Sequence, residues 1–142
     1  MDHVVYVDAK EKELQKLLDG RKSMIIRGAA GRKMPYGRVE AGDRLFFIEN
    51  DGSGMVKAEA AVTSVLNSEK MTKEQSVALV EANLEQLQLT QKQFKRWAGK
   101  RYLVLIEVDL VEECTPFKID RSDYGNMDDW LPVGLIDSIK AE

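Results

Sequence analysis

Two residue types that build catalytic and metal sites are scarce in this chain of 142 residues, which has one cysteine, Cys114, and one histidine, His3. A single cysteine cannot form a disulfide within the chain, and its place at the end of a strand-like run is typical of a buried thiol. A zinc cluster and a Ser-His-Asp triad both need more of these residues than the sequence contains. Any chemistry must therefore use other side chains.

Long apolar runs are also absent, and no stretch approaches the roughly 20 residues needed to cross a bilayer. Residues Met1 to Val7 do not combine a basic patch with an apolar segment, as a secretion signal would. The glycine-rich phosphate loops and the HExxH zinc motif do not occur, and the aspartates near the C-terminus match no calcium loop. We therefore expect a cytoplasmic protein that contacts no membrane and uses neither a metal nor a cofactor.

Charge is distributed unevenly along the sequence. The net charge is −3, but residues 21–38 and 92–101 contain eleven basic residues and no acidic one, which leaves −14 for the rest of the chain. Two basic segments on an acidic body could focus an anion at one place. Alternatively, they form two solvated faces that never meet. The basic residues are Arg21, Lys22, Arg27, Arg32, Lys33, Arg38, Lys92, Lys95, Arg96, Lys100 and Arg101.

The length and the pattern of caps and apolar residues predict a single α+β domain over residues 1–142. Asp8 and Glu11 form a capping box before a leucine stripe, which predicts a helix over about residues 9–19. Capping boxes at Thr72 and Thr90 predict two further helices, inserted before the last long strand. Because strands outnumber helices and these two helices come together, we expect a mixed or antiparallel sheet that forms a curled sheet or a small barrel. The predicted strands cover residues 23–27, 44–48, 56–62 and 102–111, the middle two forming a hairpin.

The segment from Gly20 to Arg27, GRKSMIIR, followed by Gly42-Asp43 before a strand, resembles the signature of the ASCH domain in the PUA-like barrel superfamily. In that signature a glycine, two basic residues and a serine or threonine lead into a strand that ends in arginine. The match covers roughly residues 10–65 well and the last strand less specifically. The resemblance implies a small PUA-like mixed β-barrel with an N-terminal helix and a basic cleft that binds RNA or a nucleotide.

Alternation along the strand of this signature places Ser23, Ile25 and Arg27 on one face. If Met24 and Ile26 fill the barrel, Ser23 and Arg27 line a cleft, and Lys22 turns its ammonium group toward the same opening. The glycine-rich loop that follows should add cations and one exposed ring, Tyr36, that stacks on a base. The predicted ligand-binding residues are Lys22, Ser23, Arg27, Arg32, Lys33, Tyr36 and Arg38.

The resemblance also implies an enzymatic alternative, because some ASCH proteins are amidohydrolases that act on N4-acetylcytidine through a lysine, a threonine and a glutamate. Lys22 matches the lysine, but the position of the threonine is Ile25, which has no nucleophilic atom. The remaining catalytic candidates are Ser23 and a helical glutamate, Glu81 or Glu85. Catalysis is therefore not expected. A third possibility is an adaptor whose basic face docks an acidic protein.

Two features have alternative interpretations. Trp97 lies three residues after Phe94 on a predicted helix, so it either packs in the core or stacks a base beside the neighbouring cations. The C-terminal tail could form an edge that reads a base, made of Asp123, Tyr124, Asp128, Asp129 and Trp130. They could equally form a surface loop capped by one buried tryptophan.

Overall fold

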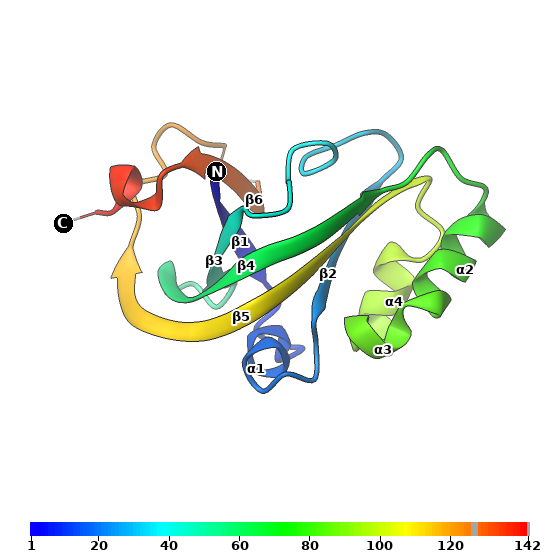
Figure 1. Ribbon diagram of the computed structural model, residues 1–142, viewed down its shortest axis with the longest axis horizontal. Coiled ribbons are helices and arrows are strands. Elements are labelled where there is room, and N and C mark those ends of the chain that lie inside the picture. The colour runs from blue at the N-terminus through cyan, green and yellow to red at the C-terminus, as the bar shows by residue number, and fades with distance from the viewer. Residues whose placement is uncertain (126–127, 142) are drawn as a thin grey trace.

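The computed structural model describes residues 1–125 and 128–141, which form one curled sheet with helices at its side (Figure 1). Asn126 and Met127 of the C-terminal tail lie outside the described residues. In chain order the elements are β1 (Asp2–Val7), α1 (Glu13–Leu18), β2 (Met24–Ala29), β3 (Arg44–Glu49), β4 (Met55–Asn67), α2 (Lys73–Ala82), α3 (Leu84–Leu87), α4 (Gln91–Trp97), β5 (Tyr102–Lys118), β6 (Trp130–Gly134) and a 3-10 turn, η1 (Ile136–Ile139).

The six strands follow the order β2-β5-β4-β3-β1-β6, which leaves β2 and β6 as the two edges of a half-barrel. β1 and β3 are parallel, and the other neighbours are antiparallel. The long strands β4 and β5 pair with three register shifts, and such bulges bend and twist a sheet. The predicted α+β fold with a small curled mixed sheet is confirmed.

Strand β2 is buried on both faces. Ile25 packs inside the half-barrel with Val5, Phe47 and Ile106. Met24 and Ile26 face outward and pack with Val80, Leu87 and Trp97 of α2, α3 and α4. The expectation that Met24 and Ile26 fill the barrel was wrong, because the helices cover the outer face of β2 and bury those two side chains there.

The helices begin where local capping permits. Helix α1 starts at Glu13 and not near residue 9, because Asp8 Oδ1 accepts a hydrogen bond from the Glu11 amide in a turn and Lys12 has a left-handed backbone with φ 56°. The capping boxes at Thr72 and Thr90 both form and open α2 and α4. The short helix α3 lies between them, so the predicted insertion has three helices instead of two.

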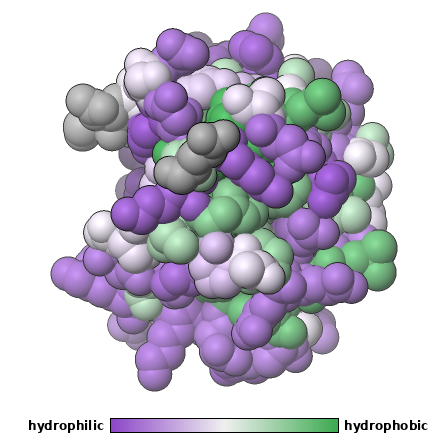
Figure 2. Space-filling view, turned by 90° about the vertical axis from the view of Figure 1, so that its left-hand side faces the viewer, coloured by the Kyte–Doolittle hydropathy of each residue, from purple (hydrophilic) through white to green (hydrophobic). Residues whose placement is uncertain are grey.

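The face of the molecule in Figure 2 is largely hydrophilic. Figure 2 shows the side of the molecule on which the C-terminus lies, where small hydrophobic patches lie between charged and polar side chains. Scattered apolar surface of this kind is normal for a globular domain. None of the described helices has the length and apolar character needed to span a membrane.

Candidate functional site

A cleft lies at the open seam of the half-barrel, between edge strand β2, helix α4 and the residues that lead into edge strand β6. It consists of two adjoining hollows of about 250 Å³ and about 330 Å³, which share Arg27, Arg96, Trp97 and Asp129. The first hollow, here called the mixed half, has acidic and basic walls. The second, the basic half, adds two lysines, one glycine and one methionine. The mixed half is further lined by Tyr6, Asp8, Glu13, Asn50, Gln93, Arg121 and Asp128, and the basic half by Gly28, Lys33, Met34 and Lys100.

Arg27 is the residue that crosses the seam. Its side chain is 8% exposed, and its two terminal nitrogens donate to the carbonyl oxygens of Ile26, at 2.8 Å, and of Tyr6 in β1, at 2.7 Å. Its Nε lies 3.3 Å from a carboxylate oxygen of Asp129, which is 45% exposed. The Nε–H is not aligned with that oxygen, so the contact is an ion pair without a hydrogen bond, and Nε has no hydrogen-bond partner among the described residues.

Arg121 reaches the same cleft from the C-terminal tail. Its Nη1 donates to the Tyr6 hydroxyl at 2.7 Å, its Nη2 donates to the carbonyl oxygen of Gly125, and its guanidinium lies over the Tyr6 ring. The buried Nε–H of Arg121 also has no acceptor in the part of the chain that the structure describes. Buried donors of a charged group usually have a partner, so these two Nε–H groups are exceptions among the described residues.

Beneath Arg27 lies a buried lysine–carboxylate pair. Lys22 Nζ donates to the carbonyl oxygen of Leu87 at 2.6 Å and lies 3.6 Å from Glu13 Oε2, with side chains 1% and 7% exposed. Burial lowers the pKa of Lys22 to about 8, helped by the charges of Arg27 and Lys16 and opposed by Glu13. Glu13 lines the mixed half, whereas Lys22 is buried beside it and lines neither half. Whether Lys22 binds a ligand stays a prediction.

Trp97 forms the flat wall between the two halves. It is 8% exposed, packs in the cluster beneath α4, and carries the guanidinium of Arg96 at 4.4 Å from its ring centroid. The guanidinium carbon of Arg27 lies 5.9 Å from the centroid of the same ring. Trp97 therefore packs in the core, as one interpretation held, and also lines both halves of the cleft. Whether it stacks a base stays a prediction.

A buried polar chain ends at Trp130, next to Arg27. The Trp130 indole donates to His3 Nδ1 at 3.1 Å, and His3 Nε2 lies 2.8 Å from Asp43 Oδ2. The indole fixes the neutral tautomer, because Nδ1 must accept and Nε2 must then donate to Asp43. Burial lowers the pKa of His3 in spite of Asp43. Trp130 is 2% exposed, and its ring centroid lies 5.6 Å from the guanidinium carbon of Arg27.

The catalytic candidates are not brought together. Glu81 and Glu85 are exposed on α2 and α3 and line neither half of the cleft, and Ser23 lines neither half as well. Ile25, at the position of the family's threonine, is fully buried in the barrel interior. The carboxylate that does lie beside Lys22 is Glu13, from the N-terminal helix.

The basic loop contributes less than its sequence suggested. Lys33 lines the basic half, whereas Arg32 lies over the rings of Tyr36 and Tyr102 and Arg38 is exposed outside both halves. Tyr36 is half-buried, with its hydroxyl donating to the Ser68 carbonyl at 2.5 Å and its ring edge-on to Tyr102. The expectation of an exposed ring was wrong because the loop folds back onto the sheet. Whether Arg32, Tyr36 and Arg38 bind a ligand stays a prediction.

Sequence reasoning missed Glu13, Asp8 and Arg121 as residues of the cleft. Glu13 carried a signal, because a carboxylate directly beside Leu14 and four residues before Leu17 falls on the buried stripe of its helix. No local sequence signal indicated Arg121, since its place depends on the path of the tail across β1. Among the described residues, no group of three or more histidine, cysteine or carboxylate side chains has a geometry that could hold a metal ion.

Comparison with family models and with curated proteins finds no match for the sequence. Solved structures do match. The ASCH protein of Zymomonas mobilis superposes with a TM-score of 0.71 at 11% identity, over 99% of this chain and 96% of that one. Two mutant forms of the same protein give a TM-score of 0.70 at 11% identity, over 96% of this chain and 93% or 91% of theirs. The fold predicted from the GRKSMIIR segment is confirmed: the chain has the fold of an ASCH domain.

Proposed function

We propose that the cleft binds a nucleotide or a short single-stranded RNA segment, with phosphate in the basic half and a base at Trp97. The observation that supports this most directly is the buried guanidinium group of Arg27, which lines both halves and whose Nε–H donor has no hydrogen-bond partner among the described residues. A phosphate oxygen is an acceptor that arginine matches well in geometry and charge.

Charge separates the roles of the two halves. The basic half has four cations, Arg27, Lys33, Arg96 and Lys100, against the single carboxylate of Asp129. The mixed half has three arginines against four carboxylates, and adds the amide side chains of Asn50 and Gln93. Phosphate therefore favours the basic half. Carboxylates and amides suit the edge of a base, whose amino groups donate and whose ring nitrogens accept.

The direct test measures fluorescence anisotropy of a labelled single-stranded RNA with the double variant Arg96→Ala/Lys100→Ala. Both residues are exposed or nearly so and line the basic half, so their removal should weaken binding while stability stays within about 0.5 kcal/mol. The matched control is Lys92→Ala/Lys95→Ala, which removes the same charge from exposed positions of α4 that line neither half. Equal losses in both doubles would show that only net charge matters.

The salt dependence of binding tests how many cations act. Three or four phosphate contacts on a single strand predict a slope of roughly −2 to −3 in a plot of log K against log salt. Lys33→Ala should flatten the slope by about 0.7, whereas Arg38→Ala, outside the cleft, should leave it nearly unchanged. Trp97→Ala should reduce affinity without altering the slope, because stacking releases no counterions.

Failure to bind any short single-stranded or duplex RNA at low salt would rule out the macromolecular ligand, and mononucleotides would then be titrated alone. If neither RNA nor mononucleotides bind and an acidic protein is retained through Arg96 and Lys100 instead, the adaptor hypothesis replaces this proposal.

A further inference from the structure

Two helices of this protein begin with the same capping box, and one of the two boxes lies in the cleft. At the start of α2 the capping glutamine is Gln75, which is exposed and lines neither half. At the start of α4 it is Gln93, which is 7% exposed and lines the mixed half. The capping role is the same at both helices, so it does not account for the place of Gln93 in the cleft.

The capping box fixes which end of the Gln93 amide is left for the cleft. The backbone N–H of Thr90 donates to Gln93 Oε1 at 3.1 Å. A backbone N–H can only donate, so the atom that it contacts is the oxygen, and the amide cannot be reversed. The oxygen is therefore used within the helix, and the amide nitrogen with its two N–H groups remains for a ligand in the mixed half. Gln93 offers the cleft a hydrogen-bond donor.

A second amide of the mixed half is held in the same sense. The backbone N–H of Ala9 donates to Asn50 Oδ1 at 2.8 Å, which leaves the amide nitrogen of Asn50 for other contacts. Trp97 follows Gln93 by one helical turn, so the two side chains share a face of α4, and both line the mixed half. A base that stacks on Trp97 therefore has its edge within reach of the Gln93 donor.

We propose that Gln93 is a specificity-determining residue, which selects an oxo base such as hypoxanthine, guanine or uracil by donating to its carbonyl oxygen. This inference rests on the proposed function, because it concerns the base of the nucleotide bound in the same cleft. A carbonyl oxygen accepts from such a donor, whereas an exocyclic amino group at that place sets N–H against N–H. In an oxo base the carbonyl group adjoins a ring N–H, which suits the carboxylates of the mixed half.

The test compares nucleoside monophosphates in two matched pairs, by NMR titration of the whole protein. Hypoxanthine carries a carbonyl group where adenine carries an amino group, and uracil differs from cytosine in the same way, while the phosphate is common to all four. The inosine and uridine monophosphates should bind about three- to tenfold tighter than their amino counterparts, as expected for one hydrogen bond. The side-chain amide signals of Gln93 should shift on binding, and those of Gln75 should not.

Gln93→Glu is the matched variant, because glutamate also closes a capping box and the start of α4 is kept. The variant replaces the N–H donors by a carboxylate oxygen, so the preference for the oxo base should disappear or reverse in favour of the amino base. The added charge weakens both members of a pair and cancels in the ratio of their affinities. Gln75→Glu adds the same charge to the other capping box and should leave that ratio unchanged.

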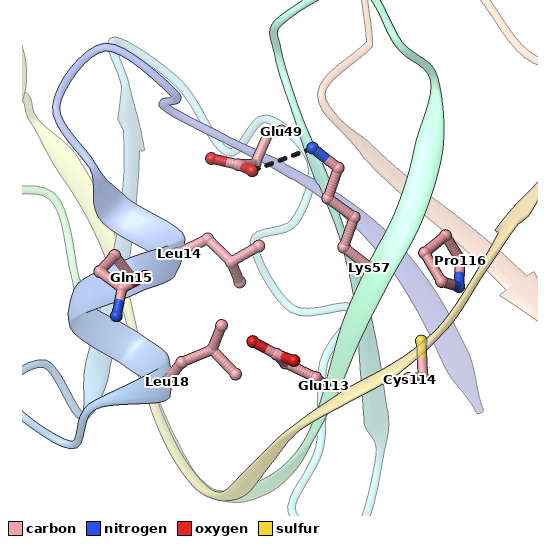
Figure 3. Close-up of a pocket in the computed structure, with 8 residues that line it drawn as sticks. All are labelled: Leu14, Gln15, Leu18, Glu49, Lys57, Glu113, Cys114 and Pro116. Atoms are coloured by element: carbon pink, nitrogen blue, oxygen red, sulfur yellow. Dashed lines mark hydrogen bonds and ion pairs between the residues drawn. The ribbon is translucent and has the colours of Figure 1, made fainter.

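A third glutamine controls for the location of the ligand. Gln15 of α1 lies at a separate cavity of about 340 Å³, between α1 and strands β4 and β5 (Figure 3), and no described residue lines both this cavity and the cleft. Shifts confined to Gln15 would place the nucleotide in that cavity and overturn the inference. Equal affinities within both pairs, or a preference that survives in Gln93→Glu, would overturn it as well.

These outcomes leave the proposed function standing, because they concern the choice of base and not binding itself. If none of the monophosphates binds, oligouridylate and oligocytidylate of equal length give the same comparison of an oxo base with an amino base. Failure of these strands to bind would refute the proposed function, and the inference that rests on it would fall with it.

Discussion

Because the ammonium group of Lys22 is buried, the pH dependence of the free energy of unfolding tests the environment that the structure gives this side chain. Burial lowers its pKa from 10.5 to about 8. Between these two values the unfolded chain binds more protons than the folded chain, so the free energy of unfolding rises with pH. The contribution is complete above about pH 10.5 and is lost as the pH falls through about 8. At about 1.4 kcal/mol per pH unit, the full change is on the order of 3 kcal/mol.

Urea unfolding of the wild type and of Lys22→Met, between about pH 7 and pH 11, measures this contribution. The free energy of unfolding of the wild type, minus that of the variant, should increase by about 3 kcal/mol from about pH 7 to pH 11. The variant also leaves Glu13 without its cation, but that cost is nearly constant over this range. Lys70→Met removes an exposed ammonium group and corrects for the loss of charge. A difference that stays flat between pH 8 and pH 10.5 would refute the reasoning, because it would mean that Glu13 keeps Lys22 protonated throughout.

Three further predictions follow from buried groups. Gly28→Ala should destabilise the domain by about 1 to 3 kcal/mol, because an added Cβ meets Leu103 Cδ2 at 2.6 Å and the Tyr102 carbonyl oxygen at 3.1 Å. Gly31→Ala, which meets nothing within 4 Å, is the control in the same urea assay. The ring protons of His3, the single histidine, should titrate by NMR with a midpoint below 6.5, and a midpoint above it would contradict the dominance of burial over Asp43. N4-acetylcytidine should be hydrolysed no faster than in buffer, as followed by chromatography, because Ile25 has no nucleophilic atom; clear turnover would show that another group has taken that role.

Much of the fold could be predicted because it depends on local signals. The capping boxes at Thr72 and Thr90 satisfy backbone donors within four residues, so both helices begin where the sequence indicates. The hairpin of β3 and β4 follows in the same way from alternation and its turn. The ordered pair of motifs, GRKSMIIR and Gly42-Asp43, identified the fold in spite of an identity of only 11% to the matching solved structures.

The rest required contacts between distant segments. Alternation correctly placed Ile25 and Arg27 on one face of β2, but it could not show which face points into the barrel, because helices from residues 73–97 bury the other face. Glu13 and Arg121 join the cleft through α1 and the C-terminal tail, and no local pattern fixes those paths. Tyr36 looked exposed because its neighbours are glycine and proline, yet its hydroxyl reaches a carbonyl 32 residues away in sequence.

In the proposed function, the open seam gives one arginine, Arg27, both a structural and a ligand-binding role. β2 and β6 are not hydrogen-bonded to each other, and Arg27 spans the gap by donating to the carbonyl oxygens of Ile26 and Tyr6. Those two bonds hold the guanidinium rigidly, which reduces the entropy lost when a ligand binds. Of the contacts of Arg27, the one with Asp129 is the easiest for a ligand to replace, because Asp129 is 45% exposed and pairs with Nε without a hydrogen bond. In the proposed function a phosphate takes the place of that carboxylate. It brings the same sign of charge and supplies the acceptor that the Arg27 Nε–H lacks, so Asp129→Asn should strengthen phosphate binding at the cleft, whereas Arg27→Ala should abolish it.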